Sequence, residues 1–236
     1  MRATKLLSSI NPEKRVFRLS NAPKTRMLFN TADVFQAQMA YGQYQPRLIK
    51  KIKSIAQPSD CVLVAGGHIG YVPLIVANFG CQVIACEADP RNAATCRDNF
   101  ELNPHLNVSL VGCGLSDKND QIPLWLSDVS SNSSFAIAHS APANAHVNVR
   151  TGDEILAELD SLELDGLVLD VEGWELKALL GLKATFARKL PRWAIIECAP
   201  WALRGAGASE AELRSAIVGL GWRISEQIGD DLICSV

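Results

Sequence analysis

The stretch CVLVAGGHIGYVPLIVANFGCQVIACE, residues 61–87, contains a complete strand–turn–helix–strand pattern. Its outer runs, 61–65 and 81–87, are short and apolar without alternation, which is typical of strands buried on both faces of a parallel sheet. The segment between them begins with a glycine-rich turn and continues as a helical pattern that ends at Gly80. This alternation of strand and helix predicts an α/β fold with a parallel sheet.

The same alternation continues toward the C-terminus. Strand-like runs occupy 108–115, 147–149, 166–171 and 193–199, and helical patterns occupy 90–103, 152–159, 175–190 and 209–222. The last two runs, 223–229 and 231–236, meet at a Gly-Asp-Asp turn, which predicts an antiparallel hairpin. Residues 116–145 are rich in Ser, Asn, Asp and Ala and predict loops, with one extra strand at 121–128. The expected architecture is a mostly parallel sheet with helices on both faces and an antiparallel C-terminal hairpin.

The first 60 residues have a different pattern. Residues 31–41 show helical spacing behind a cap-like Thr31, and residues 46–56 predict a second helix. We therefore expect an N-terminal helical segment over residues 1–60. Residues 61–236 are expected to form one larger domain, since no linker or internal repeat divides them.

The composition narrows the class of protein. The chain has 236 residues, of which 48% are hydrophobic, and this is enough for one domain with a full core. A net charge of -2 and a pI near 6.1 show no basic excess, so nucleic-acid binding is not expected. No run reaches the roughly 18 apolar residues of a membrane helix, and the N-terminus does not resemble a signal peptide. Since the seven cysteines and four histidines lack metal-ligand spacing, we expect reduced core cysteines, no bound metal and a cytoplasmic location.

A ligand site is predicted at the glycine turn, because ligands bind beyond the carboxyl ends of parallel strands. Gly66, Gly67 and Gly70 allow the backbone to approach a ligand closely. Glu87 ends the following strand, where a carboxylate can accept hydrogen bonds from ribose hydroxyls. A simple tight turn and a solvated carboxylate are the alternatives without a ligand. The G-G-x-x-G spacing differs from the dinucleotide pattern G-x-G-x-x-G, and this disfavours an NAD-dependent oxidoreductase.

Carboxylates end two later strands. The run LVLDVEGWELKALLG, residues 167–181, places Asp170 and Glu172 at the end of an apolar strand, and Glu197 ends the next one. In a parallel sheet these three side chains share one edge, where burial or a neighbouring carboxylate raises the pKa toward that of a useful base. For Glu172 and Glu175, stabilisation of a helix start is the alternative interpretation.

Several segments resemble the FkbM family of S-adenosylmethionine-dependent methyltransferases. They are AGGHIGYVPLIVA with VIACEADPRN, then VGCGLSDKND, and then LDVEGWELKALLG; the later IIECAP is similar to that family's strand ending in glutamate. The resemblance covers about residues 61–200. It implies a Rossmann-like class I methyltransferase fold with a seven-stranded sheet. It also implies S-adenosylmethionine as cofactor and methylation of hydroxyl oxygens on a sugar, glycolipid or secondary metabolite.

The resemblance also assigns roles to residues of this chain. The implied cofactor contacts are Gly66, Gly67, Ile69, Gly70, Glu87, Cys113, Gly114 and Leu115. Positions in the chain, and not the resemblance, add His68 and Ala88 to these contacts and place Asp170 beside the methionine part of the cofactor. The candidate catalytic residues, inferred in the same way, are Asp170, Glu172, Glu197 and His139, with Glu172 and Glu197 on the acceptor side. The N-terminal segment is expected to cover a small-molecule or glycan acceptor, and a homo-oligomer is left open.

Three positions depart from the family pattern. Val64 stands where the family usually has Asp, His68 where it has Asn, and Val168 where it often has Lys. These changes remove polar groups beside the expected cofactor. They leave open the alternative of a catalytically weakened binding protein that keeps the methyltransferase fold.

Overall fold

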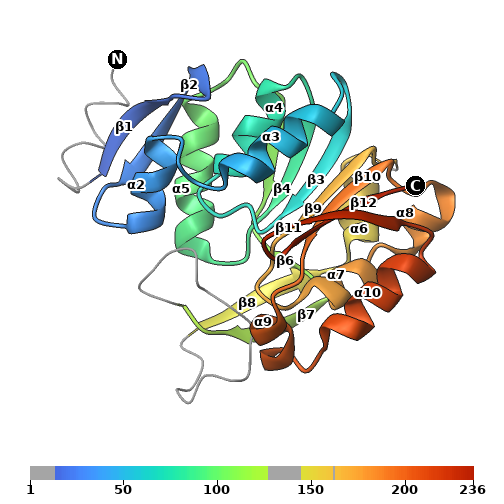
Figure 1. Ribbon diagram of the computed structural model, residues 1–236. Helices are drawn as coiled ribbons and strands as arrows, with labels where there is room; N and C mark the ends of the chain where they lie inside the picture. The colour runs from blue at the N-terminus through green and yellow to red at the C-terminus, as the bar shows by residue number, and fades with distance from the viewer. Residues whose placement is uncertain (1–13, 127–144, 162) are drawn as a thin grey trace.

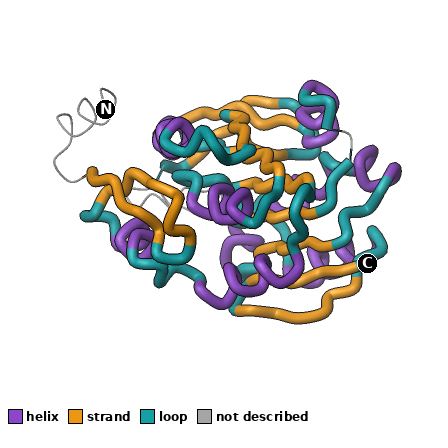
Figure 2. The backbone as a smooth tube through the Cα atoms, turned by 90° about the horizontal axis from the view of Figure 1, so that it is seen from above, coloured by secondary structure: helices purple, strands orange, loops and turns teal. Residues whose placement is uncertain are grey.

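The computed structural model describes residues 14–126, 145–161 and 163–236, and its centre is a seven-stranded sheet with helices on both faces (Figures 1 and 2). The strands of this sheet are β3 (Cys61–Ala65), β4 (Gln82–Cys86), β5 (Val108–Val111), β9 (Gly166–Leu169), β10 (Trp193–Glu197), β11 (Arg223–Ile228) and β12 (Asp231–Ser235). Only β12 runs antiparallel to the others, and it forms a hairpin with β11. The predicted fold class is thus confirmed.

The order of the strands creates a switch point in the sheet. The spatial order is β11-β12-β10-β9-β3-β4-β5, so the chain proceeds from β3 outward in one direction and later from β9 outward in the other. In an open α/β sheet the crevice at such a reversal, beyond the carboxyl ends of the strands, is where ligands bind. The fold therefore predicts a site beside the ends of β3 and β9.

Two apolar cores lie on opposite faces of the sheet, and alternate residues of each strand enter them. Val62 and Val64 pack on the side of α3 (Pro46–Ile55) and α4 (Tyr71–Asn78). Leu63 and Ala65 pack on the side of α6 (Gly152–Glu158), α7 (Glu175–Leu180), α8 (Lys183–Arg188) and α10 (Glu210–Gly219). The strands are apolar without alternation because both of their faces are buried.

The N-terminal segment is not entirely helical as expected, because it begins with the antiparallel hairpin of β1 (Lys14–Leu19) and β2 (Ala22–Asn30). Phe17 packs against the core that contains Met27 and Phe29, whereas the charged residues between them face outward. Mixed charged and apolar residues obscured this half-buried strand pattern. The helix α2 (Val34–Ala40) follows, and it is capped by the carboxylate of Asp33 instead of Thr31.

The hairpin is attached to α5 (Pro90–Glu101) and to the turn just after it through two asparagine side chains. Asn99 Oδ1 accepts from the Leu28 N–H at 2.6 Å, and Asn103 Oδ1 accepts from the Arg26 N–H at 2.9 Å. These bonds satisfy backbone groups of β2 that no strand pairs. They hold the N-terminal segment against the main domain.

Two predicted elements are each divided in the structure. The run 108–115 forms β5 in the main sheet and then leaves that sheet. Its last two residues form β6 (Gly114–Leu115), which belongs to a smaller sheet with β7 (Asp120–Leu124) and β8 (Ala145–Arg150). The helical pattern 175–190 separates into α7 and α8 near Gly181, because the Asp153 carboxylate accepts from the N–H groups of Ala184 and Thr185 and starts a new helix there. Thr151 caps α6, and α9 (Pro200–Gly205) was not predicted.

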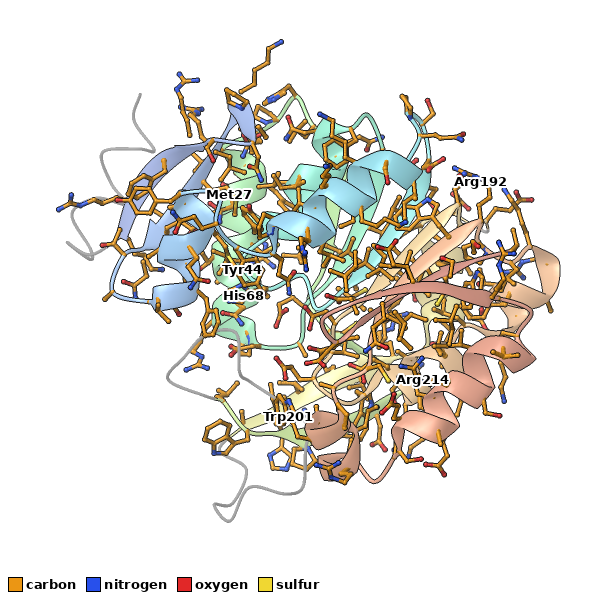
Figure 3. The ribbon with its side chains drawn as sticks, viewed as in Figure 1. Met27, Tyr44, His68, Arg192, Trp201 and Arg214 are labelled. Carbon is orange, nitrogen blue, oxygen red and sulfur yellow. The ribbon has the colours of Figure 1, made fainter. Side chains whose placement is uncertain are left out.

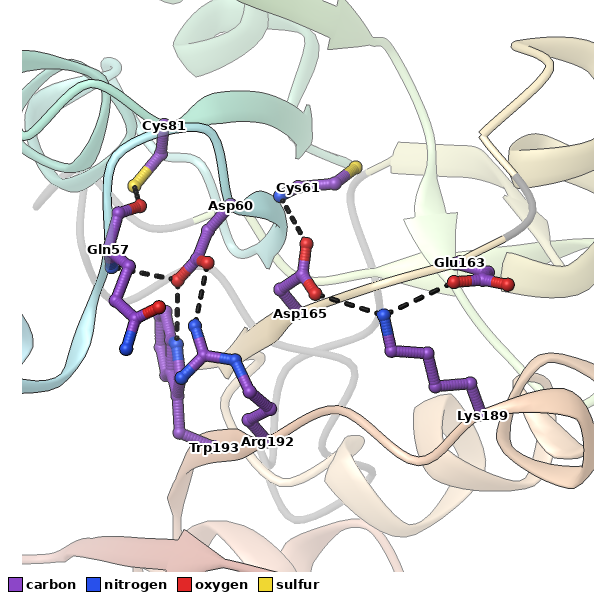
Figure 4. A network of polar contacts seen from close by, with 9 residues as sticks. All are labelled: Gln57, Asp60, Cys61, Cys81, Glu163, Asp165, Lys189, Arg192 and Trp193. Atoms are coloured by element: carbon purple, nitrogen blue, oxygen red, sulfur yellow. Dashed lines mark hydrogen bonds and ion pairs between the residues drawn. The ribbon is translucent and has the colours of Figure 1, made fainter.

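Polar contacts fix the opposite ends of the central strands (Figure 4). Asp60, just before β3, accepts from Arg192 Nη2 at 2.6 Å and from Trp193 Nε1 at 3.3 Å at the start of β10. Asp165, just before β9, accepts from the Cys61 N–H at 3.0 Å and pairs with Lys189 at 3.1 Å. These contacts set the alignment of β3, β9 and β10, and the alignment in turn places their carboxyl ends together.

Candidate active site

A cavity opens at the carboxyl ends of β3, β4, β9 and β10, at the switch point of the sheet. Its empty volume is about 1050 Å³, a figure that includes the open mouth and adjoining solvent. One wall comes from the glycine turn and the strand ends, and the other comes from α2 and the connection between α2 and α3. In Figure 3, His68 marks the wall formed by the glycine turn, and Tyr44 marks the wall formed by the connection between α2 and α3.

The glycine turn is held against the neighbouring strand. The N–H groups of Gly66 and Gly67 both donate to the Cys86 carbonyl, at 3.0 and 2.9 Å. Gly66 has φ +83°, and a Cβ there would lie 1.7 Å from the Asp170 carbonyl oxygen. The absence of a side chain thus allows the end of β3 to pass directly against the end of β9. His68 is also left-handed, with φ +48°, a conformation that His shares with Asn and Asp among residues other than glycine.

Glu87 connects the turn to the end of β4. Its carboxylate accepts from the His68 N–H at 2.7 Å and from the Asp89 N–H at 2.8 Å, and the residue is 8% exposed. Burial raises the pKa of Glu87 to about 7, and the two backbone hydrogen bonds oppose that rise. Each carboxylate oxygen has one backbone partner and retains a second lone pair at the cavity wall.

The segment after β9 makes a left-handed turn that presents two carboxylates. Glu172 has φ +54° and Gly173 has φ +100°, so the chain reverses sharply after Asp170. The buried Glu175 stabilises this turn, because its Oε1 accepts from the N–H groups of Val171 and Gly173, both at 3.1 Å. Asp170 and Glu172 line the cavity, whereas Glu175 lies behind them and positions the turn.

Carboxylates from three strand ends gather at this part of the cavity, and burial raises the pKa of each. The pKa is raised to about 6 for Asp170 and to about 8 for Glu172, where Asp170 and Glu175 add repulsion. Glu197 has the largest rise, to about 10, caused by burial and then by Asp170 and Glu172. Asp231, opposite Glu197 in the register of β10 and β12, is raised to about 7 by burial and then by Asp170. Glu172 and Glu197 are consequently protonated near neutral pH.

The cluster should make the ligand-free protein less stable as the pH rises. Glu197 is protonated in the folded chain up to about pH 10 but loses its proton near pH 4.3 when unfolded, so the folded state binds more protons between these values and stability falls with rising pH. We expect the melting temperature of the wild type to fall more between pH 6 and 9 than that of Glu197→Gln, measured by calorimetry. The exposed Glu163→Gln serves as the control and should follow the wild type. Equal slopes in wild type and Glu197→Gln would contradict this assignment.

Aromatic side chains from the N-terminal segment form part of the cavity wall opposite the glycine turn. The Tyr44 ring makes edge contacts with Phe35 and Tyr71, at centroid distances of 6.4 and 5.9 Å. Burial raises the pKa of Tyr44 far above its usual value, and Asp170 and Glu197 add to the rise. The Tyr44 hydroxyl therefore stays protonated and is a hydrogen-bond donor beside the carboxylates.

The structure brings most of the predicted site residues to this cavity. Those that line it are Gly66, Gly67, His68, Glu87, Ala88, Gly114, Leu115, Asp170, Glu172 and Glu197. Ile69, Gly70 and Cys113 are not on the cavity wall, and Ile69 and Cys113 are buried. His139 lies outside the described residues.

Sequence reasoning missed other residues of the site. Phe35, Met39 and Gln45 line the cavity although they precede the main sheet by many residues, and Asp89 and Asn92 line it from the start of α5. Asp231 was interpreted only as part of a turn. The predicted antiparallel hairpin could have indicated Asp231, because an antiparallel last strand places its first residues beside the end of the strand with which it pairs.

The described residues contain neither a metal-binding cluster nor a membrane-spanning helix. Within residues 14–126, 145–161 and 163–236, no group of His, Cys, Asp or Glu side chains is arranged to hold a metal ion. Over the same residues, no helix has the length and apolar character that crossing a membrane requires.

Comparisons with known proteins agree with this geometry. The family described as the methyltransferase FkbM domain matches residues 65–221. Monomeric WbdD is similar in structure, with a TM-score of 0.53 and 15% identity over 98% of this chain and 48% of that one. The Pyrococcus abyssi tRNA (uracil-54, C5)-methyltransferase in complex with S-adenosyl-L-homocysteine has a TM-score of 0.50 and 14% identity over 94% of this chain and 44% of that one. No curated protein sequence matches. At these identities the structural likenesses show the fold alone.

Proposed function

Because the chain belongs to the FkbM methyltransferase family, we propose that it transfers the methyl group of S-adenosylmethionine to a hydroxyl oxygen of a small-molecule or glycan acceptor. The observation that supports this most is the position of the cavity. It joins the glycine turn, Glu87 and the Asp170–Glu172 turn at the switch point of the sheet. The acceptor is expected to be a sugar, a glycolipid or a secondary metabolite.

The residues present fit S-adenosylmethionine. Gly66 and Gly67 carry no side chain where the methionine part would pass. Glu87 has acceptor capacity left for the two ribose hydroxyls. Gly114 and Leu115 line the side expected for the adenine ring. A structural relative was solved with S-adenosyl-L-homocysteine, the product of this cofactor.

The cofactor supplies an activated methyl group, so the chain's own residues must align the acceptor and accept its proton. Glu172 is the proposed base, because it lines the cavity and has a pKa of about 8, closer to the operating pH than that of an ordinary carboxylate. Glu197 and the Tyr44 hydroxyl are proposed to hold the acceptor. The N-terminal residues Phe35 and Met39 are proposed to cover it.

Calorimetry with S-adenosylmethionine tests the cofactor assignment. Glu87→Ala removes a carboxylate that would bind both ribose hydroxyls, and hydrogen bonds to a charged group contribute about 1.5–3 kcal/mol, so affinity should fall at least about tenfold. Glu101→Ala, on the exposed side of α5, is the control and should bind as the wild type does. If the wild type gave no heat of binding, the proposal would fail. Binding without methyl transfer to any compound of a metabolite extract would favour the catalytically weakened binding protein instead.

A further inference from the structure

The acceptor side of the cavity gathers several ionisable carboxylates. The cavity is lined by five carboxylates and, among the described residues, by no Lys or Arg. Two of the five carboxylates are satisfied locally: Glu87 by backbone N–H groups and Asp89 by Arg91 at 2.7 Å. Asp170, Glu172 and Glu197 therefore have no cationic partner on the described cavity wall.

Buried carboxylate oxygens in this cluster lack hydrogen-bond partners. Within the described part of the chain, Oε2 of Glu172, Glu175 and Glu197 is buried and accepts no hydrogen bond. Glu175 is 1% exposed, and its charge acts on both Glu172 and Glu197. Buried polar atoms are nearly always paired in native proteins, so an unpaired group at a cavity wall indicates a ligand that supplies the missing donors.

The pairing of Glu197 with a second carboxylate is an independent observation that favours a cationic ligand. It lies directly opposite Asp231 in the antiparallel pair of β10 and β12. Two carboxylates directly opposite each other repel when both are ionised, and no Lys or Arg of the described residues forms an ion pair with either side chain. Both carboxylates can therefore be ionised together at low cost only when positive charge enters the cavity.

We propose that the acceptor carries an ammonium group next to the hydroxyl that is methylated, and that Glu172 and Glu197 hold this ammonium, with Asp231 behind them. This inference rests on the proposed function and names the substrate class as amino alcohols, including amino sugars. An ammonium group has three N–H donors and no acceptor, which matches several carboxylates with free oxygens. Phe35 and Met39 provide apolar contact for the carbon skeleton.

The alternatives to an ammonium group fit less well. A hydroxyl offers one donor and no charge, so a neutral polyol does not stabilise the ionised forms of Glu172 and Glu197. A metal ion is disfavoured because no described side chains have the arrangement to hold one. The positive charges of the cofactor belong beside Asp170, the residue proposed for its methionine part, and they leave Glu172 and Glu197 to the acceptor.

Two probes that differ only in one group test the proposal. Protein saturated with S-adenosylhomocysteine is titrated with trans-2-aminocyclohexanol and, separately, with trans-cyclohexane-1,2-diol. We expect the amine to bind at least about tenfold more tightly, since charge-assisted hydrogen bonds are roughly twice as strong as neutral ones. Its binding should also release protons, because it stabilises the ionised forms of Glu172 and Glu197, which are protonated in the ligand-free protein near neutral pH. Proton release is read from the dependence of the heat on the buffer.

Two variants, and a measurement of S-adenosylhomocysteine binding made before the titrations, complete the experiment. Glu197→Gln should lose most of the preference for the amine, and the exposed Glu163→Gln should retain it. An equal response to the two probes, including no response to either, overturns the inference, and so does a preference that survives in Glu197→Gln. Binding of S-adenosylhomocysteine is measured first. Its absence would reject the proposed function, whereas its presence without an amine preference would reject only the present inference.

Discussion

Replacing Gly66 with alanine is expected to abolish S-adenosylmethionine binding and to lower the melting temperature by roughly 10 °C. The new Cβ would lie 1.7 Å from the carbonyl oxygen and 2.8 Å from the carbonyl carbon of Asp170. These are backbone atoms, and the Asp170 N–H donates to the Ala65 carbonyl at 3.1 Å. The end of β9 therefore cannot move away from the new Cβ without breaking this hydrogen bond. A left-handed alanine and the steric clash together cost about 3 kcal/mol or more, which corresponds to that shift in a domain of this size.

Gly219→Ala is the matched control for this substitution. Gly219 ends α10, its φ is not left-handed, and a Cβ there meets no atom within 4 Å. Its melting temperature and its cofactor affinity should equal those of the wild type or rise slightly, since alanine favours the helix. Differential scanning calorimetry and isothermal titration give both quantities. A Gly66→Ala protein with wild-type affinity would show that the cofactor does not depend on the crossing of β3 and β9.

The central sheet was predictable because its strands are buried on both faces and appear as continuous apolar runs. The stretch from Cys61 to Glu87 contains two such strands and the helix that links them, and each local signal agrees with the final fold. The hairpin at 14–30 was missed for the opposite reason. Its strands are exposed on one side, and they take part of their stabilisation from side chains of α5, such as Asn99, more than 60 residues away. Contacts of that kind have no local pattern.

The candidate site was predictable to the extent that it follows from strand ends. The carboxyl ends of parallel strands meet at one edge, so residues as distant as Gly66, Glu87, Asp170 and Glu197 were expected together, and all four line one cavity. Tyr44 and Gln45 reach the cavity only because the N-terminal segment packs over it. That packing depends on the tertiary contacts of the hairpin and α2, and no sequence motif predicts those contacts.

The departures from the family pattern acquire a common explanation in the structure. Val64 and Val168 are direct partners in the register of β3 and β9. An apolar pair thus stands where an Asp and a Lys were expected, so neither of these two positions holds an unpaired charge. Removing one member of a buried ion pair is strongly destabilising, whereas replacing both with apolar residues is often neutral. His68 similarly occupies a left-handed position that suits both histidine and the expected Asn.

Glu172→Gln is expected to reduce kcat by a factor of about 10² to 10⁴ while leaving S-adenosylmethionine affinity nearly unchanged. Glutamine keeps the shape of the side chain but cannot take the proton from the acceptor hydroxyl, and general-base catalysis contributes about that factor. The measurement is the transfer of labelled methyl groups to the acceptor, together with titration of the cofactor. Because burial raises the pKa of Glu172 to about 8 in the ligand-free protein, its basic form increases with pH, so kcat/KM of the wild type should rise up to about pH 8 and then level off. Glu172→Gln should lose this rise.

Glu175→Gln separates a base from a residue that merely shapes the turn. The glutamine Oε1 can still accept from the N–H groups of Val171 and Gly173, so the left-handed turn at Glu172 should persist. Removal of the Glu175 charge also removes one source of the raised pKa of Glu172. We therefore expect Glu175→Gln to retain most of the wild-type kcat and to shift the rise in kcat/KM toward lower pH. If Glu175→Gln abolished the rise and Glu172→Gln preserved it, the base would have to be assigned to Glu175, and the cavity-facing position of Glu172 would then serve binding alone.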